Sequence, residues 1–358
     1  MELKKYKLGE ILDVTRGASL SGEFYAAEGE YVRLTCGNFD YQNNCFKENK
    51  AKDNLYYIGD FKPDFLMKEG DIITPLTEQA IGLLGSTAII PESGKYIQSQ
   101  DVAKIVCKEH LLNKDFAFYL ISSNLVKQQL SAAAQQTKIR HTSPDKIKDC
   151  IVWIPELEEQ KRIGKLLRTI DLKIELNRQL NHNLEAMAKQ LYDYWFVQFD
   201  FPDENGKPYK SSGGKMVWDK RLKREIPLLW KAKIVEEVAD VYNGATPSTV
   251  NELNYGGDIV WITPKDLSDQ KQKFVYQGER NISQVGYDSC STHLLPSNTI
   301  LMSSRAPIGL LAIAKTELCT NQGFKSFVSK SKNIATYLYY YLQYHITQIE
   351  QLGTGTTF

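Results

Sequence analysis

Residues 156–199 read ELEEQKRIGKLLRTIDLKIELNRQLNHNLEAMAKQLYDYWFVQF, a stretch without proline in which Gly164 is the only glycine. Two series of positions repeat every seven residues within it. They are Ile163, Ile170, Asn177, Leu184 and Leu191 and, four residues further on, Leu167, Ile174, Asn181, Ala188 and Trp195. Eight of these ten residues are apolar. The pattern predicts a helix of 44 residues, about 66 Å long, with a seam that packs along another helix as in a coiled coil.

A helix packed on its own domain is the alternative interpretation. A core helix seldom keeps a seven-residue repeat over five heptads, which favours the coiled coil. Asn177 and Asn181 lie in the middle of the seam, where polar residues either fix the register and the partner or are simply partly exposed. The predicted helix-pairing seam consists of Ile163, Leu167, Ile170, Ile174, Asn177, Asn181, Leu184, Leu191 and Trp195.

The chain on both sides of this helix carries two copies of one unit. Residues 8–18 match residues 235–245 with five identities in eleven positions, and the tetrapeptide 81–84, Ile-Gly-Leu-Leu, recurs unchanged at 308–311. Strand-like runs, a glutamine and an aromatic-rich helical stretch follow in the same order in each copy. We therefore predict an α+β fold with two similar modules, residues 1–155 and 232–358, joined by the spacer helix 156–199 and a linker, 200–231.

The second copy is shorter than the first. Phe358 aligns near Thr137, and the first copy continues from there for another 62 residues that include the long helix. We therefore expect one spacer helix where a chain with two complete copies would have two.

Composition excludes several classes of protein. The 358 residues include 44 Lys and Arg against 43 Asp and Glu, a net charge of +1, which argues against a disordered chain and a strongly basic nucleic-acid coat. Local basic surfaces can still bind DNA. No apolar run approaches 18 residues, the N-terminus lacks the apolar stretch of a signal peptide, and none of the six cysteines forms a C-x-x-C pair. These features predict a cytoplasmic protein with reduced thiols and no zinc site.

Motifs of enzymes are poorly represented. The sequence has no Gly-x-Gly-x-x-Gly after a strand, no phosphate-binding Gly-x-x-x-x-Gly-Lys-Ser/Thr and no Asn-Pro-Pro-Tyr of an amino-methyltransferase. One arrangement, Asp145 with Glu159 and Lys161, has the spacing of a metal-dependent nuclease. A turn after Pro144 and an acidic first turn of the spacer helix explain these residues better. We expect a non-catalytic protein that binds no metal and no cofactor of its own.

Several short motifs occur in a fixed order along the chain. They are Ile154-Pro155 with Glu159-Gln160, Leu191-Tyr192-x-x-Trp195-Phe196, Ile226-Pro227-x-x-Trp230, Gly244-Ala245-Thr246-Pro247-Ser248, Ser304-Arg305-Ala306-Pro307-Ile308-Gly309, Thr320-Asn321-Gln322-Gly323-Phe324 and Gly353-Thr354-Gly355-Thr356. In this order they resemble the DNA-specificity (S) subunit of type I restriction-modification enzymes, over essentially the whole chain. The resemblance implies two target-recognition domains joined by a coiled-coil helix.

The resemblance also implies a function. Each recognition domain would bind one half of a bipartite DNA site, and the helix would fix their separation. Adenine methylation with S-adenosylmethionine, and ATP- and Mg-dependent restriction, would belong to partner modification and restriction subunits. The seam could also pair with a second copy of the chain as a homodimer. The alternatives are a truncated, inactive or regulatory specificity fragment and, more remotely, a nuclease using Asp145, Glu159 and Lys161.

Polar loops at corresponding places of the two modules supply candidate DNA contacts, because Lys and Arg neutralise phosphates while Arg, Asn, Gln, Ser and Thr meet base edges. In the first module they are Arg33, Asn38, Thr77, Gln79, Gln98, Gln100, Lys138 and Arg140. In the second they are Thr246, Ser248, Lys265, Ser304, Arg305, Asn321, Gln322 and Lys325. Gln100 and Gln322 occupy matching places, which suits a structural hydrogen bond as well as a base contact.

Overall fold

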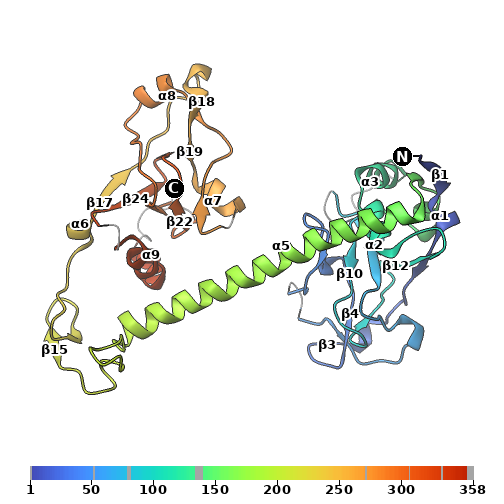
Figure 1. Ribbon diagram of the computed structural model, residues 1–358, viewed down its shortest axis with the longest axis horizontal. Helices are drawn as coiled ribbons and strands as arrows, with labels where there is room; N and C mark the ends of the chain where they lie inside the picture. Colours follow the sequence, from blue (N-terminus) through green and yellow to red (C-terminus); the bar gives the residue numbers. More distant parts are fainter. Residues whose placement is uncertain are drawn as a thin grey trace. The chain divides into compact units, whose positions relative to one another are not determined.

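The computed structural model describes residues 2–50, 53–78, 82–133, 140–270, 272–305, 307–331 and 334–352. The chain forms two compact units, residues 1–179 and 180–358 (Figure 1). Each unit combines helices with a sheet, so the predicted α+β fold is confirmed. Within the described ranges, no helix has both the length and the apolarity that a membrane span requires.

The first unit is built on a four-stranded antiparallel sheet in the order β10-β8-β12-β2. Its strands are β2 (Leu12–Arg16), β8 (Ile72–Pro75), β10 (Ala88–Ile89) and β12 (Val102–Cys107). A smaller sheet contains β3 (Tyr25–Ala26), β4 (Tyr31–Arg33), β7 (Tyr56–Tyr57) and β11 (Tyr96–Ile97). Three further pairs join β1 (Lys4–Lys7) with β14 (Ile151–Ile154), β5 (Phe39–Asp40) with β6 (Cys45–Phe46), and β9 (Thr77–Glu78) with β13 (Arg140–His141).

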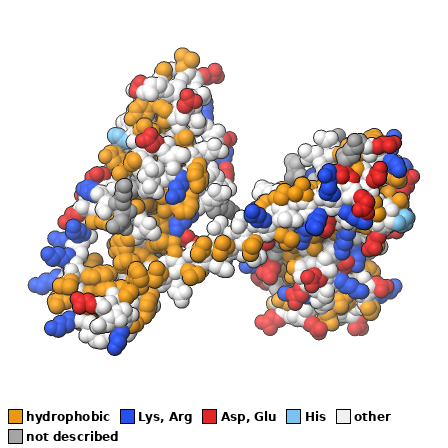
Figure 2. All heavy atoms as spheres, viewed as in Figure 1, with side chains coloured by type: hydrophobic (Ala, Val, Ile, Leu, Met, Phe, Trp, Pro, Cys, Tyr) orange, Lys and Arg blue, Asp and Glu red, His pale blue; other side chains and the backbone are white. Residues whose placement is uncertain are grey.

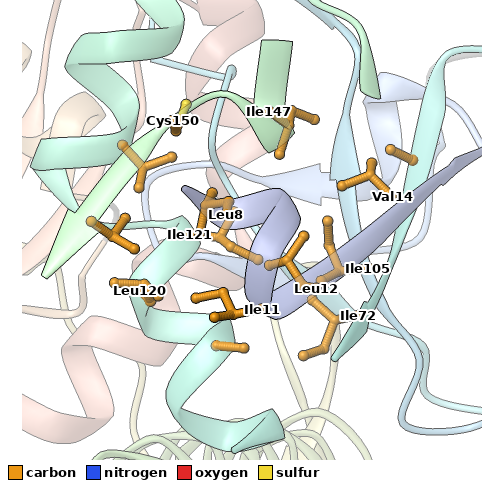
Figure 3. Packing of buried hydrophobic residues seen from close by; sticks show 14 of the residues in the cluster. Leu8, Ile11, Leu12, Val14, Ile72, Ile105, Leu120, Ile121, Ile147 and Cys150 are labelled. Carbon is orange, nitrogen blue, oxygen red and sulfur yellow. The ribbon is translucent and has the colours of Figure 1, made fainter. Parts of the chain in front are cut away.

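The core of this unit lies between the larger sheet and its helices, α1 (Leu8–Ile11), α2 (Lys114–Ile121), α3 (Asn124–Ala133) and α4 (Pro144–Lys148). Figure 3 shows Ile11, Leu12, Ile72, Ile105 and Ile121 among the side chains that pack there. All five are buried. Each such side chain contributes about 1.5–3 kcal/mol by leaving water, so this cluster holds the sheet and its helices together.

The second unit contains a five-stranded sheet in the order β17-β24-β21-β22-β20. Its strands are β17 (Ala239–Asn243), β20 (Phe274–Val275), β21 (Ile300–Ser303), β22 (Leu311–Ala314) and β24 (Phe324–Ser329). The other strands of this module are β18 (Tyr255–Ile259), β19 (Trp261–Ile262) and β23 (Cys319–Thr320). Its helices are α6 (Val235–Val238), α7 (Pro264–Gln270), α8 (Gln284–Asp288), α9 (Ile334–Tyr344) and α10 (Ile346–Leu352).

The internal repeat of the sequence corresponds to one strand order found in both units. The order β2-β12-β8-β10 in the first unit matches β17-β24-β21-β22 in the second. In each unit the first strand of this order, β2 or β17, follows a four-residue helix, α1 or α6. The two helices are capped at their start in the same way. The Glu10 carboxylate accepts a hydrogen bond from Lys7 N at 2.7 Å, and the Glu237 carboxylate accepts one from Ile234 N at 2.8 Å. The predicted pair of similar modules is therefore confirmed.

The long helix is α5 (Leu157–Tyr192), followed by the π-helical turn η4 (Asp193–Val197). It ends just before Phe199, whose positive φ of 66° breaks the helical path. Two residues fix its start on the first unit. The side chain of Gln160 donates to the carbonyls of Leu111 and Pro155, at 3.0 and 2.9 Å. A Cβ on Gly164 would lie 2.7 Å from Phe116 N. The backbone of α5 therefore approaches α2 so closely that only glycine fits at this position.

The predicted seam is divided between two environments. Ile163, Leu167 and Trp195 are half-buried, whereas Ile170, Ile174, Asn177, Asn181, Leu184 and Leu191 are exposed. Leu180, Leu184, Met187 and Leu191, here called the apolar stripe, are spaced by four, three and four residues and share one face of the helix. Their exposed fractions are 52, 52, 63 and 47%. Figure 2 shows hydrophobic side chains along the exposed part of α5.

Residues 200–231, a linker in the sequence analysis, contain a hairpin of β15 (Met216–Asp219) and β16 (Arg224–Pro227). The Phe201 ring stacks on Tyr209 and on Trp230, with centroid separations of 4.8 and 5.0 Å. The Asp200 carboxylate accepts hydrogen bonds from the backbone and hydroxyl of Ser211. These contacts give the segment an ordered fold of its own.

Candidate nucleic-acid interface

In the second unit, three loops meet at one end of the sheet. β24 lies between β17 and β21 and runs antiparallel to both, so it begins where they end. Asn243 pairs with Lys325, and Ser303 pairs with Phe324. The loops that follow β17 and β21 and the loop that precedes β24 therefore lie together. These loops and the start of β24 carry Thr246, Ser248, Ser304, Arg305, Asn321, Gln322 and Lys325, seven of the eight candidates predicted for this module.

Most of these side chains are exposed or half-buried, and some contact one another. The hydroxyl of Thr246 donates to the side-chain oxygen of Gln322. Lys325 Nζ donates to Asn243 Oδ1 at 2.6 Å. Arg305 and Ser248 are exposed. This edge therefore presents two cationic side chains, Arg305 and Lys325, and several amide and hydroxyl groups to solvent. Such groups can bind phosphates and base edges.

The eighth candidate, Lys265, lies on α7 beside this edge. The residue before it, Pro264, is 2.9 Å from the position that a Cβ on Gly323 would take. Lys265 is exposed and forms an ion pair with Glu279 at 2.8 Å. This pairing raises the pKa of Lys265, chiefly through the hydrogen bond from its ammonium to Glu279, so the ammonium stays charged.

The first unit has the same arrangement at the corresponding end of its sheet. β12 begins where β2 and β8 end, and Ala103 faces both Arg16 and Thr74. β13 pairs with β9, which brings Arg140 opposite Glu78. The Arg140 guanidinium lies 3.6 Å from the buried Glu78 carboxylate and donates to Ser131 Oγ at 2.9 Å. Two candidates from distant parts of the sequence, Thr77 and Arg140, are therefore brought to one edge.

Several first-module candidates serve the module's own structure. Arg33 is buried, with its guanidinium 3.8 Å from the centroid of the Tyr25 ring. Asn38 is buried and accepts a hydrogen bond from Thr35 N at 2.9 Å. Thr77 is also buried. These placements favour structural roles over base contacts. Two further candidates, Gln79 and Lys138, lie outside the described residues, as does the glycine-threonine motif at 353–356.

The two glutamines that the repeat aligns do occupy equivalent places. Ala18 N donates to Gln98 O at 2.9 Å, and Ala245 N donates to Thr320 O at 3.0 Å. Gln100 and Gln322 each stand two residues beyond these carbonyls, and both are exposed. The Gln322 side chain accepts a hydrogen bond from Thr246. In the first module the buried Gln98 makes structural hydrogen bonds, because its amide donates to Thr15 O and Val102 O at 2.7 and 3.0 Å.

Sequence reasoning missed two exposed residues of these edges, Arg16 and Asn243. Both are the last residue of the first strand in their module, directly before Gly17 and Gly244. The signal was present in the repeat, where Arg16-Gly17-Ala18 aligns with Asn243-Gly244-Ala245. The sequence does not show that the residue before each glycine is exposed at the end of its strand, because that depends on the paired strand.

The residues with nuclease-like spacing are used in local ion pairs. Asp145 pairs with Lys148, Glu159 with Arg162, and Lys161 with Glu158, each three positions away. Nowhere in the described part of the chain do three or more His, Cys, Asp or Glu side chains gather as a metal site would require.

Comparison with known proteins identifies the family of these modules. The family model described as "Type I restriction modification DNA specificity domain" matches residues 1–186 and 227–358. The MjaIX specificity subunit of Methanocaldococcus jannaschii is 39% identical over 150 residues, which cover 40% of this chain and only 35% of that protein. The HindI specificity subunit of Haemophilus influenzae is 24% identical over 404 aligned positions, covering 99% of this chain and 85% of that protein.

A solved structure has the same fold over almost the whole chain. It is the S subunit of a type I restriction-modification system from M. genitalium, with a TM-score of 0.58. The comparison covers 99% of this chain and 80% of that one, at 14% sequence identity. At that level of identity the likeness concerns the fold.

Proposed function

Since the chain belongs to the family of type I restriction-modification DNA specificity proteins, we propose that it is the non-catalytic DNA-recognition subunit of a type I restriction-modification complex. The observation that carries the proposal is the duplicated sheet edge. Two modules with one strand order present polar loops from the same end of the sheet, and these loops carry different side chains. Different side chains on one frame suit the recognition of two different half-sites.

Each module would bind one half of a bipartite site. Recognition would come from residues 1–155 and 232–358, with α5 as the spacer between them. Exposed candidates at the edges, such as Gln100, Arg305 and Gln322, would contact bases or phosphates. Buried ones, such as Arg33 and Asn38, would support the loops from beneath.

Chemistry would be performed by partner subunits. A modification subunit would transfer the methyl group of S-adenosylmethionine to adenine, and a restriction subunit would use ATP and Mg²⁺ for cleavage. The local ion pairs of Asp145, Glu159 and Lys161 support a non-catalytic role over the nuclease alternative.

The apolar stripe of α5 suggests how a partner is held. Four side chains on one helix face remain about half exposed, and their burial against another helix would be favourable. We propose that this face pairs with a helix of a second protein chain, either a second copy or the modification subunit.

Methylation mapping tests the function. The full chain, co-expressed with its modification subunit, should direct adenine methylation to a single two-part sequence. Replacing residues 303–325 by the corresponding loops of another module should change one half of that sequence and leave the other intact. A simultaneous change of both halves would contradict the two-module assignment. Methylation or cleavage by the purified chain alone would contradict the non-catalytic role.

A further inference from the structure

Each module has the same close crossing of two backbone segments at its candidate edge. A Cβ on Gly17 would lie 2.2 Å from Gln98 O and 2.3 Å from Ser99 O. A Cβ on Gly244 would lie 2.1 Å from Asn321 O and 2.2 Å from Thr320 O. Real side chains do not approach a carbonyl oxygen so closely, so each crossing requires glycine. The alanine after each glycine then donates its N–H to the crossed loop, as described above.

This crossing fixes the residue before each glycine at an equivalent point of its module. The residue is Arg16 in the first module and Asn243 in the second, and both are exposed at the end of the first strand. They face the same position of the neighbouring strand, occupied by Ala103 in the first module and by Lys325 in the second. One frame therefore presents two different side chains to solvent.

Arg16 is held in a way that orients its guanidinium. Its Nε donates to Gln100 O at 2.8 Å. Arginine has five N–H donors, so this bond leaves the two Nη groups and their four N–H. Within the described part of the chain these groups have no hydrogen-bond acceptor or ion-pair partner. A guanidinium presented through its Nη groups can donate two parallel hydrogen bonds to O6 and N7 of guanine.

The side chain of Asn243 is also held by a hydrogen bond, but it presents an amide in place of a guanidinium. Its Oδ1 accepts from Lys325 Nζ at 2.6 Å, which leaves the Nδ2 amide hydrogens and a second lone pair of Oδ1. An asparagine amide donates to N7 and accepts from N6 of adenine with that pair of groups. Gln98 is buried and donates to backbone carbonyls, so it offers no such group to solvent.

We infer that the residue before the crossing glycine is the specificity-determining residue of each module, with Arg16 contacting a guanine of one half-site and Asn243 an adenine of the other. The inference rests on the proposed function and adds to it the residues and bases concerned. Because the backbone frame is the same in both modules, exchanging this residue together with its strand partner should exchange the base without rebuilding the loop.

The test uses the full chain co-expressed with the modification subunit, with methylation mapped at every variant of the wild-type site. Arg16→Ala should reduce the preference for guanine at one position of one half-site by about 5- to 150-fold, the loss expected for a bidentate pair. Asn243→Arg combined with Lys325→Ala, which gives the second module the alanine that faces Arg16 in the first, should change an adenine preference to guanine in the other half. In each case the unaltered half-site is an internal control. Arg162→Ala, an exposed arginine at the start of α5, is the matched control and should leave both halves unchanged.

Arg16→Met separates recognition from folding, because it keeps an unbranched side chain at this exposed position and removes every hydrogen-bond donor. It should fold like the wild type, with a similar melting temperature, and still lose the guanine preference. A full guanine preference in Arg16→Met or Arg16→Ala would overturn the inference, as would an equal loss at all sequences, which marks a phosphate contact. These outcomes would leave the proposed function intact. A wild-type complex that methylates no two-part site would overturn both.

Discussion

Leu184→Glu should disrupt association through the apolar stripe of α5. Complete burial of a Leu or Met side chain is worth about 1.5–3 kcal/mol, and these side chains are already about half buried, so each has about 1 kcal/mol still to gain. Two helices pairing through Leu180, Leu184, Met187 and Leu191 would gain about 8 kcal/mol from burial. The cost of association offsets much of this gain, so a weak, concentration-dependent association is expected. In a homodimer the substitution occurs twice. It removes about 2 kcal/mol and buries two unpaired carboxylates, so association should weaken by about a thousandfold or more.

The assay is light scattering at tens of micromolar, first with the chain alone and then with the modification subunit. Leu229→Glu is the matched control, since Leu229 is 88% exposed and lies outside the helix. The control should associate like the wild type. Circular dichroism checks that α5 is still formed. If Leu184→Glu associates as strongly as the control in both settings, the stripe is not an interface and the reasoning is refuted.

Three other predictions concern single residues. Arg305→Ala should reduce methylation at one base pair by about 1–3 kcal/mol if Arg305 contacts a base, whereas a uniform loss with a lower salt dependence in a binding assay would identify a phosphate contact. Gln160→Ala should lower the free energy of unfolding in urea by about 1–3 kcal/mol, because Gln160 is buried and its partners would lose their hydrogen bonds; an unchanged midpoint would contradict this. Burial raises the pKa of the Cys319 thiol to about 11, so its alkylation at pH 8 should be about a hundredfold slower than in the urea-unfolded chain. By the same shift, Cys319 stabilises the fold fully below the unfolded thiol's pKa and loses this contribution as the pH rises towards 11.

The repeat and the long helix could be predicted because each leaves a periodic or duplicated pattern. Residues 8–18 and 235–245 align in sequence, and in the structure they form the same helix-then-strand element in each unit. The heptads predicted α5, but they could not say which of its faces would be covered. Gly164 and Gln160 attach the helix to the first unit through contacts with residues far away in the sequence. Part of the apolar pattern is therefore used within the unit, and the exposed stripe runs through Leu180 and Met187, outside the predicted seam.

Candidate contacts could be predicted only as residue types in loops, because exposure depends on neighbours that the local sequence does not reveal. Gln98 and Gln100 look alike in sequence, but one is buried under two backbone carbonyls and the other is exposed. Arg33 has the chemistry of a DNA contact but stacks on Tyr25 within its own module. The pairing of β13 with β9, which brings Arg140 beside Glu78, joins segments more than 60 residues apart.

Under the inference above, the glycine crossings would let a duplicated module change its target without losing its fold. Gly17 and Gly244 are constrained by backbone oxygens within 2.3 Å of any added Cβ, so the frame tolerates little change there. The residue before each glycine is exposed, and its strand partner differs between the modules. Substitution at that point alters hydrogen-bonding groups while the core beneath, including Ile105 in one module and Phe327 in the other, remains buried. If Arg16 and Asn243 contact bases as inferred, stability and specificity depend on separate residues that lie next to each other in the chain, and the exposed residue can vary while the glycine is kept.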